Sequence, residues 1–540
     1  MTRNLDADLK TLRTVLEFAQ NRDFVRAAAL AEQTLADGFE HPMLLNVLAT
    51  RLEQQNKLEE ALKLLQRAVA IAPADIGARN ALALCLQRLE RPAEALVHVE
   101  ELLKTHPELA FVHANKGNAL IALGNLGDAR QSHLRALELE PKNLAALASL
   151  ASIATQRGEH EEARRFAVQA LQLAPGFPDA ILSVAAADLA EGNGAKAEAA
   201  LHGVIADSRA GAWDRARASG LLGDVLDAAG RYPQAFDSYS TCNHTLQQIH
   251  RRYAEGTRVS DYARSLTRAV ERVAPTAWRA PDSSELSAGE ALAHVFLVGF
   301  PRSGTTLLEV VLDGHPNVAS LEEHELLTDG VLRYMREPLD LEPLASAAHG
   351  QLEDLRAAYW SGVQRAGVAA AGKVFIDKHP LNTLKLPLIA KLFPRAKVLF
   401  AVRDPRDVVL SCFRRRFKMN PAMYELLSLS GAAGLYDAVM NFADAVKLKL
   451  NLDWCDVRYE ALVADFEPRV RGLCDFMGLE WRAGMGDFAQ RVQSREHATP
   501  STAQLSRGLS TSSVEQWRHY EPQLQSILPQ LKPWLQRFGY

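Results

Sequence analysis

Small apolar residues recur at a fixed interval along the first half of the chain. Alanine returns every 34 residues, at Ala27, Ala61, Ala95, Ala129, Ala163 and Ala197. Proline keeps the same interval, at Pro73, Pro107, Pro141 and Pro175. An alanine lets two paired helices approach closely, and a proline ends the second helix of a pair. The pattern predicts a helix–turn–helix unit that repeats along the chain, with an irregular last unit around Ala235.

A period of 34 residues is typical of tetratricopeptide repeats. One unit cannot bury its apolar face alone, so the units must stack into a curved, all-α superhelix with a concave surface. We predict such a domain over residues 1–272, with about seven helical pairs. Its concave face is a candidate docking surface for a protein or peptide partner. The alternative is a spacer or structural cap for the second half.

The second half changes pattern. Short apolar runs at 295–298, 373–376, 397–402 and 455–459 are each followed by a helical pattern. This alternation predicts an α/β domain, a mostly parallel sheet with helices on both faces, over residues 293–540. Residues 273–292 mix proline with small polar residues and are the predicted linker. Ligands of parallel sheets bind beyond the carboxyl ends of the strands, so residues that follow these runs should converge. They are Arg302, Asp377 with Lys378, Arg403, and Tyr459 with Glu460.

The segment Gly299–Thr306 has the spacing of a nucleotide-binding P-loop, but Thr305 stands where the P-loop lysine belongs. The glycines of such a loop let backbone N–H groups close around a phosphate at a helix N-terminus. Without the lysine, the loop is better suited to one phosphate beside a nucleoside than to a nucleoside triphosphate. Arg302 adds a forked cation to this P-loop-like cradle.

Composition narrows the function only slightly. The 540 residues carry a net charge of −4, which gives no general reason to expect nucleic acid as a partner. The five cysteines are scattered and read as reduced thiols, and no apolar run is long enough for a transmembrane segment. The first residues carry acids where a signal peptide is apolar, so we expect a cytoplasmic protein. A local basic cluster is either a solvated helix face or part of a ligand site. It comprises Arg414, Arg415, Arg416 and Lys418.

Several motifs in a fixed order carry a family resemblance. The run Pro301–Leu307, continued by 312–316 and Glu322–Glu323, resembles the 5′-phosphosulfate-binding segment of sulfotransferases, most closely the tyrosylprotein sulfotransferases. The similarity continues through 377–380, 392–397, 402–404 with Ser411, 459–460 and 501–504, and ends near Arg507 and Trp517. Tetratricopeptide repeats joined to such a domain also resemble a known bacterial architecture.

The resemblance implies that 3′-phosphoadenosine-5′-phosphosulfate (PAPS) is the donor and that its sulfuryl group passes to an acceptor hydroxyl or amine. The acceptor is then a protein, tyrosine included, a glycan or a small molecule. For the 5′-phosphosulfate the implied ligands are Arg302, Ser303, Gly304, Thr305 and Thr306. For the 3′-phosphate they are Arg403 and Ser411. Tyr459 and Arg507 complete the implied donor site.

The resemblance also implies the catalytic groups. Glu323 matches the general base, Lys378 the cation near the bridging oxygen, and Ser501 a serine that assists there. A glutamate can serve as the base if burial raises its pKa toward neutrality. The alternative for Glu323 is a helix-start acid, because 320–323 reads as a capping box. The scheme needs no metal, and adjacent acids at 322–325 on a helix would point in different directions.

Two departures concern the acceptor. Glu325 stands where the tyrosylprotein enzymes carry arginine, and His379 where they carry aspartate. Both argue against a tyrosine on an acidic peptide and leave a metabolite, a lipid or a glycan open. Two rival functions remain. One is an NTP-dependent kinase, which needs a Mg²⁺-binding acid such as Asp377 or Asp404. The other is a repeat scaffold with an inactive nucleotide domain.

Overall fold

The computed structural model describes residues 5–278, 291–337, 339–494 and 511–540. The chain divides into two compact units, Met1–Ala187 and a second that holds Asp188–Arg495 and Thr499–Tyr540. Most of the linker expected at 273–292 lies outside the described residues. The domain bounds drawn from the sequence therefore stay a prediction.

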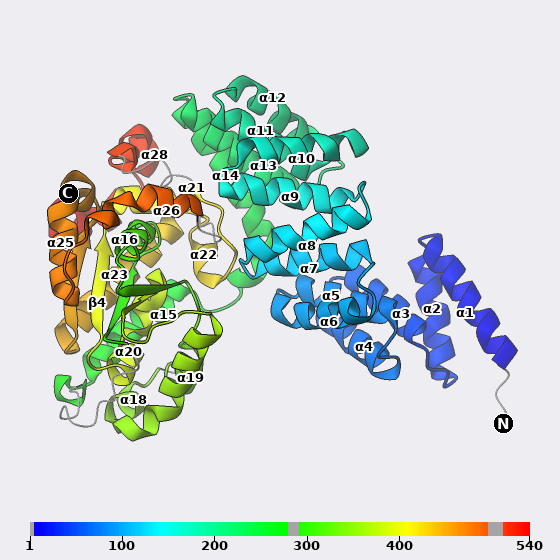
Figure 1. Ribbon diagram of the computed structural model, residues 1–540, viewed down its shortest axis with the longest axis horizontal. Coiled ribbons are helices and arrows are strands. Elements are labelled where there is room, and N and C mark those ends of the chain that lie inside the picture. Colours follow the sequence, from blue (N-terminus) through cyan, green and yellow to red (C-terminus); the bar gives the residue numbers. More distant parts are fainter. Residues whose placement is uncertain (1–4, 279–290, 338, 495–510) are drawn as a thin grey trace. The chain divides into compact units, whose positions relative to one another are not determined.

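The first unit is a succession of helices joined by short turns (Figure 1). The helices are α1 (Leu5–Gln20), α2 (Phe24–Ala36), α3 (Pro42–Gln54), α4 (Leu58–Ile71), α5 (Ile76–Arg88), α6 (Pro92–Thr105), α7 (Ala110–Ala122), α8 (Leu126–Leu139), α9 (Leu144–Arg157) and α10 (His160–Leu173). Each of these helices packs on the next, and α11 (Pro178–Ala190) runs across into the second unit. The all-α repeat fold is confirmed.

The 34-residue period has the physical cause that the sequence suggests. The recurring alanines from Ala27 to Ala197, and Ala235 in the irregular unit, are all 0% exposed. Each recurring proline comes two residues after a helix end, as Pro73 does after Ile71 of α4. Small side chains therefore stand where helices touch, and proline stands where a helix has to stop.

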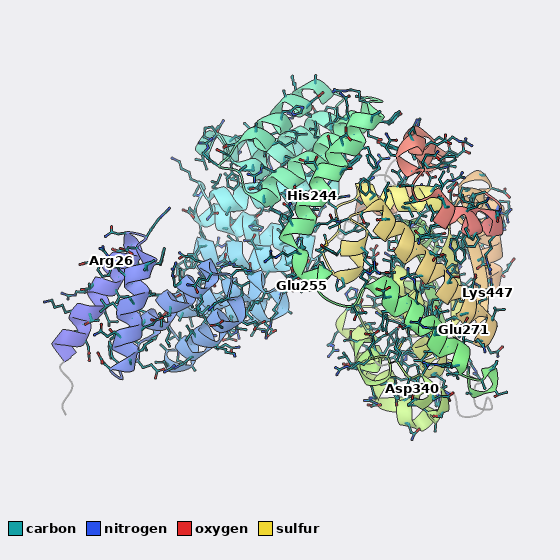
Figure 2. All side chains as sticks on the ribbon, turned by 180° about the vertical axis from the view of Figure 1, so that it is seen from behind. Arg26, His244, Glu255, Glu271, Asp340 and Lys447 are labelled. Carbon is teal, nitrogen blue, oxygen red and sulfur yellow. The ribbon has the colours of Figure 1, made fainter. Side chains whose placement is uncertain are left out.

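The second unit begins with more helices, which are α12 (Gly194–Ala206), α13 (Ala212–Ala228), α14 (Tyr232–Ile249), the 3-10 turn η1 (Arg251–Ala254), α15 (Val259–Arg272) and η2 (Pro275–Trp278). The helices α12, α13 and α14 pack in sequence, as in the first unit. The next helix, α15, packs instead along α23 (Leu429–Lys449) of the α/β part. Figure 2 shows α15, which carries Glu271, beside α23, which carries Lys447.

A five-stranded parallel sheet forms the centre of the α/β part. Its strands are β1 (Ala293–Gly299), β2 (Val318–Glu322), β3 (Val374–Lys378), β4 (Lys397–Val402) and β5 (Asp453–Arg458). The order is β2-β3-β1-β4-β5, with every neighbouring pair parallel. The parallel sheet and four of these strands match the sequence prediction. The fifth, β2, lies where 320–323 reads as a capping box, so that alternative is wrong.

Helices surround the sheet. They are α16 (Thr305–Leu312), α17 (Thr328–Tyr334), α18 (Glu342–Ser346), η3 (His349–Leu352), α19 (Glu353–Arg365), η4 (Pro380–Lys385), α20 (Leu386–Leu392), α21 (Pro405–Arg414), α22 (Pro421–Glu425), α24 (Tyr459–Ala464), α25 (Phe466–Met477), η5 (Ala483–Asp487), α26 (Phe488–Ser494), η6 (Thr511–Ser513), η7 (Gln516–Tyr520), α28 (Glu521–Leu524) and α29 (Leu528–Phe538). In the described parts of the chain, no helix has both the length and the apolar character to cross a membrane.

Alternate strand residues feed two separate cores. Val295 and Leu297 of β1 pack with α16 and α25 on one face. Phe296, from the same strand, belongs to an aromatic cluster with Tyr359 of α19 and Phe393 on the other face. The chain leaves β1 toward β2 and leaves β4 toward β5, in opposite directions across the sheet. The carboxyl ends of β1 and β4 therefore form the switch point at which such sheets bind ligands.

One repeat of the first unit departs from the others. His133 on α8 is fully buried at a position that is apolar in the neighbouring repeats, namely Leu65, Val99, Ala167 and Leu201. Its ring lies over Gly117, where an added Cβ would come within 2.4 Å of the ring. Neither ring nitrogen has a hydrogen-bond partner in the described structure. Burial lowers the pKa of His133 to about 4.

The replacement His133→Leu should therefore stabilise the repeat array, most strongly in mild acid. The unfolded chain binds a proton near pH 6.5 and the folded chain near pH 4, so the wild type loses stability as pH falls between them. The full loss is about 3 kcal/mol. Urea unfolding at pH 7 and pH 5 should show about 2 kcal/mol of this loss for the wild type and none for the variant. A variant less stable than the wild type at pH 5 would contradict this account.

Candidate active site

Two glycines shape the loop that follows β1. Gly299 has φ +150°, and an added Cβ would lie 2.7 Å from the carbonyl oxygen of Ala401 on β4. Gly304 has φ +97°, and its Cβ would lie 2.5 Å from the ring of Tyr459. Side chains are excluded at both positions, by backbone strain and by lack of space. The loop is thus fixed between β4 and Tyr459.

The loop delivers a helix N-terminus to the carboxyl edge of the sheet. Thr383 of η4 holds the loop in position. Its hydroxyl accepts a hydrogen bond from the Gly299 N–H (3.0 Å) and donates one to the Gly299 carbonyl oxygen (2.8 Å). Ser303 and Thr305 are buried, and Thr306 is half-buried. Because α16 begins at Thr305, the N–H groups of its first turn lack acceptors within the helix. This geometry suits an anion.

Two arginines and a serine meet beside the loop. Arg302 has φ +70°, and its Nε donates to Ser411 Oγ at 3.0 Å. Arg403, which follows β4, donates from Nη1 to Arg302 O at 3.2 Å. Because α21 begins at Pro405, Ser411 returns to this edge of the sheet. The predicted convergence of Arg302 and Arg403 is observed, and Ser411 joins them.

Three arginines, Arg302, Arg403 and Arg415, concentrate positive charge beside the loop. Burial, followed by repulsion from Arg415 and Arg403, lowers the pKa of Arg302 to about 9. The Nε of Arg403 has no hydrogen-bond partner among the described residues. An anion bound here would relieve this repulsion, and a phosphate can accept forked hydrogen bonds from the guanidinium groups.

Tyr459 closes one side of the arginine group. Its ring lies 4.8 Å from the Arg403 guanidinium, and its hydroxyl hydrogen-bonds Ser513 Oγ at 2.6 Å. Arg403 also donates to the carbonyl oxygen of Ser513. Two predicted site residues, Ser501 and Arg507, lie outside the described residues.

The second group of predicted residues centres on Lys378 at the end of β3. This lysine is 0% exposed, and its Nζ lies 2.7 Å from Glu322 Oε1 and 2.8 Å from Glu323 Oε1. Strand register accounts for the first contact, since Glu322 of β2 pairs with Lys378. Glu323 takes a left-handed turn, φ +51°, and donates its N–H to Lys378 O at 2.7 Å. The turn directs its side chain out of the strand plane, where it is 49% exposed.

The pKa directions differ from those expected. Burial acts to raise the pKa of Glu323, but attraction to Lys378, His379 and Arg302 outweighs it, and the pKa is lowered. Burial raises the pKa of Glu322 against the pull of Lys378, helped by Glu309 and Glu323. The raised carboxyl pKa expected at Glu323 is therefore found at its neighbour.

A further set of charges lies beside the lysine group. His379 Nε2 is 3.1 Å from Glu325 Oε1, and Lys385 donates to the other oxygen. The hydrogen bond from His379, followed by the charge of Lys385, lowers the pKa of Glu325 to about 2. The Glu325 carboxylate is thus paired with His379 and Lys385, just as Glu322 and Glu323 are paired with Lys378.

Sequence reasoning misses two contributors. One is Glu322, whose role depends on a partner in another strand. The other is Arg415, which the sequence places in a basic cluster without a role of its own and which directly follows the last residue of α21. Its neighbours Arg414 and Arg416 are neither a solvated face nor donor ligands, because they form ion pairs with Asp227 and Asp224 of α13.

Known proteins share both halves of this organisation. The sulfotransferase family model matches residues 294–483. Tetratricopeptide repeat models match residues 12–76, 52–115 and 114–178.

Three similar proteins illustrate the extent of the likeness. An uncharacterized protein of Aquifex aeolicus is 24% identical over 405 residues, which are 73% of this chain and 51% of that protein, so the chain spans about half of its length. Protein-tyrosine sulfotransferase 1 of Danio rerio is 26% identical over 258 residues, 46% of this chain and 72% of the relative. The solved sulfotransferase domain of the Synechococcus PCC 7002 olefin synthase is 23% identical, covers 45% of this chain and 90% of its own, and has a TM-score of 0.32. The chain thus joins tetratricopeptide repeats to a domain of the sulfotransferase family.

Proposed function

We propose that this protein transfers the sulfuryl group of PAPS to an acceptor hydroxyl. One observation carries the proposal: a fully buried lysine, ion-paired to a half-exposed glutamate, lies at the same sheet edge as a glycine cradle with converging arginines. The cradle suits the 5′-phosphosulfate, and the arginine group suits a second phosphate. A donor charged at both ends of its ribose satisfies both.

The donor site has a division of labour. The backbone and hydroxyls of 303–306, with Arg302, hold the 5′-phosphosulfate at the start of α16. Arg403 and Ser411 hold the 3′-phosphate, with Arg415 adding charge. Tyr459 packs against Gly304 and Arg403 and limits the space beside them.

Lys378 and its two partners, Glu322 and Glu323, form the part of the site where the reaction takes place. Glu323 takes the proton of the acceptor hydroxyl as its oxygen bonds to sulfur, and the bond from sulfur to the bridging oxygen breaks in line. The Lys378 ammonium moves toward the bridging oxygen and stabilises the negative charge that develops there. As the lysine moves away from Glu323, the carboxylate loses the attraction that lowers its pKa and becomes a stronger base. Glu322 is the partner of this lysine on the neighbouring strand.

The acceptor side is less acidic than Glu325 alone suggests, because His379 and Lys385 balance that carboxylate. The tyrosine substrates named for several relatives remain one option. Neutral glycan, lipid or metabolite hydroxyls are others. The repeat array is suited to holding the acceptor or a partner protein.

The rival functions find less support. The kinase rival needs Asp377 or Asp404 for Mg²⁺, yet Asp377 accepts from the Tyr359 hydroxyl at 2.7 Å, and Asp404 caps α21 and pairs with Arg406. The scaffold rival leaves the buried Lys378–Glu323 pair without a purpose.

Calorimetry separates the kinase rival from the proposal. Binding of 3′,5′-bisphosphoadenosine in the presence of a chelator supports the proposal, and Mg²⁺-dependent ATP binding alone would overturn it.

The variants Arg302→Ala and Arg403→Ala should each weaken binding of 3′,5′-bisphosphoadenosine by roughly 1.5–3 kcal/mol, the usual worth of a charge-assisted hydrogen bond. Calorimetry on the full chain measures the loss. Arg471→Ala, which removes an exposed arginine paired with Glu467, is the matched control and should bind as the wild type does. Unchanged affinity in both site variants would refute the donor assignment.

The pair Glu323→Gln and Glu322→Gln should separate binding from turnover. Glu323→Gln should reduce turnover by about 10²–10⁴-fold, the usual worth of a general base, and leave nucleotide affinity unchanged. Glu322→Gln removes the same charge from the same lysine but not the base, and should retain most turnover. Transfer of ³⁵S from labelled PAPS into a cell extract provides the measurement, and the size of the labelled product identifies the acceptor class. Equal losses in the two variants would count against Glu323 as the base.

The pH profile should reflect the lowered pKa of Glu323. Because the free enzyme keeps this base ionised down to below its ordinary value of 4.5, kcat/KM should show no acid limb from it between pH 5 and 8. Initial rates of label transfer at low PAPS concentration across this range test the point. An acid limb near pH 6 that disappears in Glu323→Gln would mean that Lys378 does not hold this carboxylate in solution.

A further inference from the structure

The segment that ends α21 passes from the donor site to the helical hairpin α13–α14. Within it, Ser411 contacts Arg302, and Cys412 Sγ lies 3.5 Å from Pro301 O. The next residue, Phe413, already belongs to the hairpin surface, because its carbonyl oxygen accepts a buried hydrogen bond of 2.8 Å from Asn243 Nδ2 on α14. Its ring also stacks on Phe236, with 5.1 Å between centroids. A single turn of helix therefore connects the two places.

Two aspartates of α13 bind the arginines that follow. Arg414 Nη2 donates to Asp227 Oδ2, and Arg416 Nη2 donates to Asp224 Oδ2, both at 2.6 Å. Each aspartate also accepts from a buried tyrosine, Asp224 from Tyr239 at 3.0 Å and Asp227 from Tyr520. The four side chains of the two ion pairs are between 15% and 32% exposed. Ion pairs shielded from water and braced by further hydrogen bonds hold a geometry better than exposed ones.

The backbone of α13 also packs closely against Arg416. Gly220 of α13 lies under Arg416, and an added Cβ would come within 2.7 Å of its guanidinium. The same helix therefore supplies both the acids and the space for the arginine. Arg415, held between two anchored neighbours, makes no ion pair with any described residue. Asp224 attracts it from a distance, and its charge helps to lower the pKa of Arg302.

We propose that Asp224 and Asp227 are positioning residues for the donor: by holding Arg414 and Arg416 they fix the end of α21, and with it Ser411 and Arg415, to receive the 3′-phosphate. This inference rests on the proposed function, since it needs a donor with that phosphate. It makes the α13–α14 hairpin, whose helices continue the repeat array, a working part of the nucleotide site. Both aspartates bind arginine side chains, so they act through the arginines.

Two physical effects of removing the carboxylates have opposite signs. If the aspartates position Arg415, then Asp224→Asn and Asp227→Asn should loosen it and weaken binding of the 3′-phosphate. If they only neutralise positive charge, the same variants leave more positive charge near the site and should strengthen binding of any phosphate. The sign of the change therefore distinguishes positioning from simple charge compensation.

The test is calorimetry on the full chain with two probes, 3′,5′-bisphosphoadenosine and adenosine 5′-monophosphate, which differ only in the 3′-phosphate. Wild-type binding of the bisphosphate is measured first, because its absence would refute the proposed function itself. Each aspartate variant should then bind the bisphosphate about tenfold more weakly, within the range of one charge-assisted contact, and the monophosphate as the wild type does. A misfolded fraction lowers the stoichiometry and leaves the dissociation constant unchanged.

Two further variants complete the design. Asp237→Asn makes the same change at an exposed position of α14 and should bind both probes as the wild type does. Asp224→Glu keeps the charge and should recover part of the lost affinity. Unchanged or tighter bisphosphate binding in Asp224→Asn and Asp227→Asn would overturn the inference, as would an equal loss for both probes.

Discussion

Burying Lys378 is the constraint on which the candidate site depends. A lysine removed from water loses far more hydration energy than a single ion pair returns, unless its partners are close and well placed. Two carboxylates at 2.7 and 2.8 Å meet that condition, one in register on the next strand and one on the turn that follows. The same arrangement keeps one glutamate within the sheet and leaves the other half-exposed on the turn that follows. Strand pairing and reactivity are therefore two results of one contact.

The donor side meets the opposite problem, an excess of like charge. Arg415 and Arg403 repel Arg302, and the structure tolerates this because Arg403 donates to the Arg302 carbonyl oxygen and lies 3.6 Å from Asp407, while Asp224 attracts Arg415. Glycine at 299 and 304 brings the loop close enough for these ties to form. Such a site is prepared for an anion before the anion arrives, and little rearrangement is needed on binding.

Local patterns made most of the fold predictable. The 34-residue spacing of alanine reports helix contacts within one repeat, and four strands follow from apolar runs. The strand β2 does not follow, because five residues that include Ser320 and Glu322 show too little apolar character. The candidate site residues were placed by motif, but their pKa directions were not, since Glu323 meets Lys378 across 55 positions. The partners of Arg414 and Arg416 are 187 and 192 residues away, beyond any sequence pattern.

That separation has a consequence for how the chain is made. At about 5–20 residues per second, Arg414 leaves the ribosome roughly 10–40 s after Asp227. During this interval the newly synthesised α13 carries two carboxylates whose arginine partners do not yet exist, on a surface that later becomes half-buried. The earlier helices can pack on one another as they emerge. The α13–α14 hairpin keeps its two aspartates in water until the strand and helix that carry the arginines have been translated.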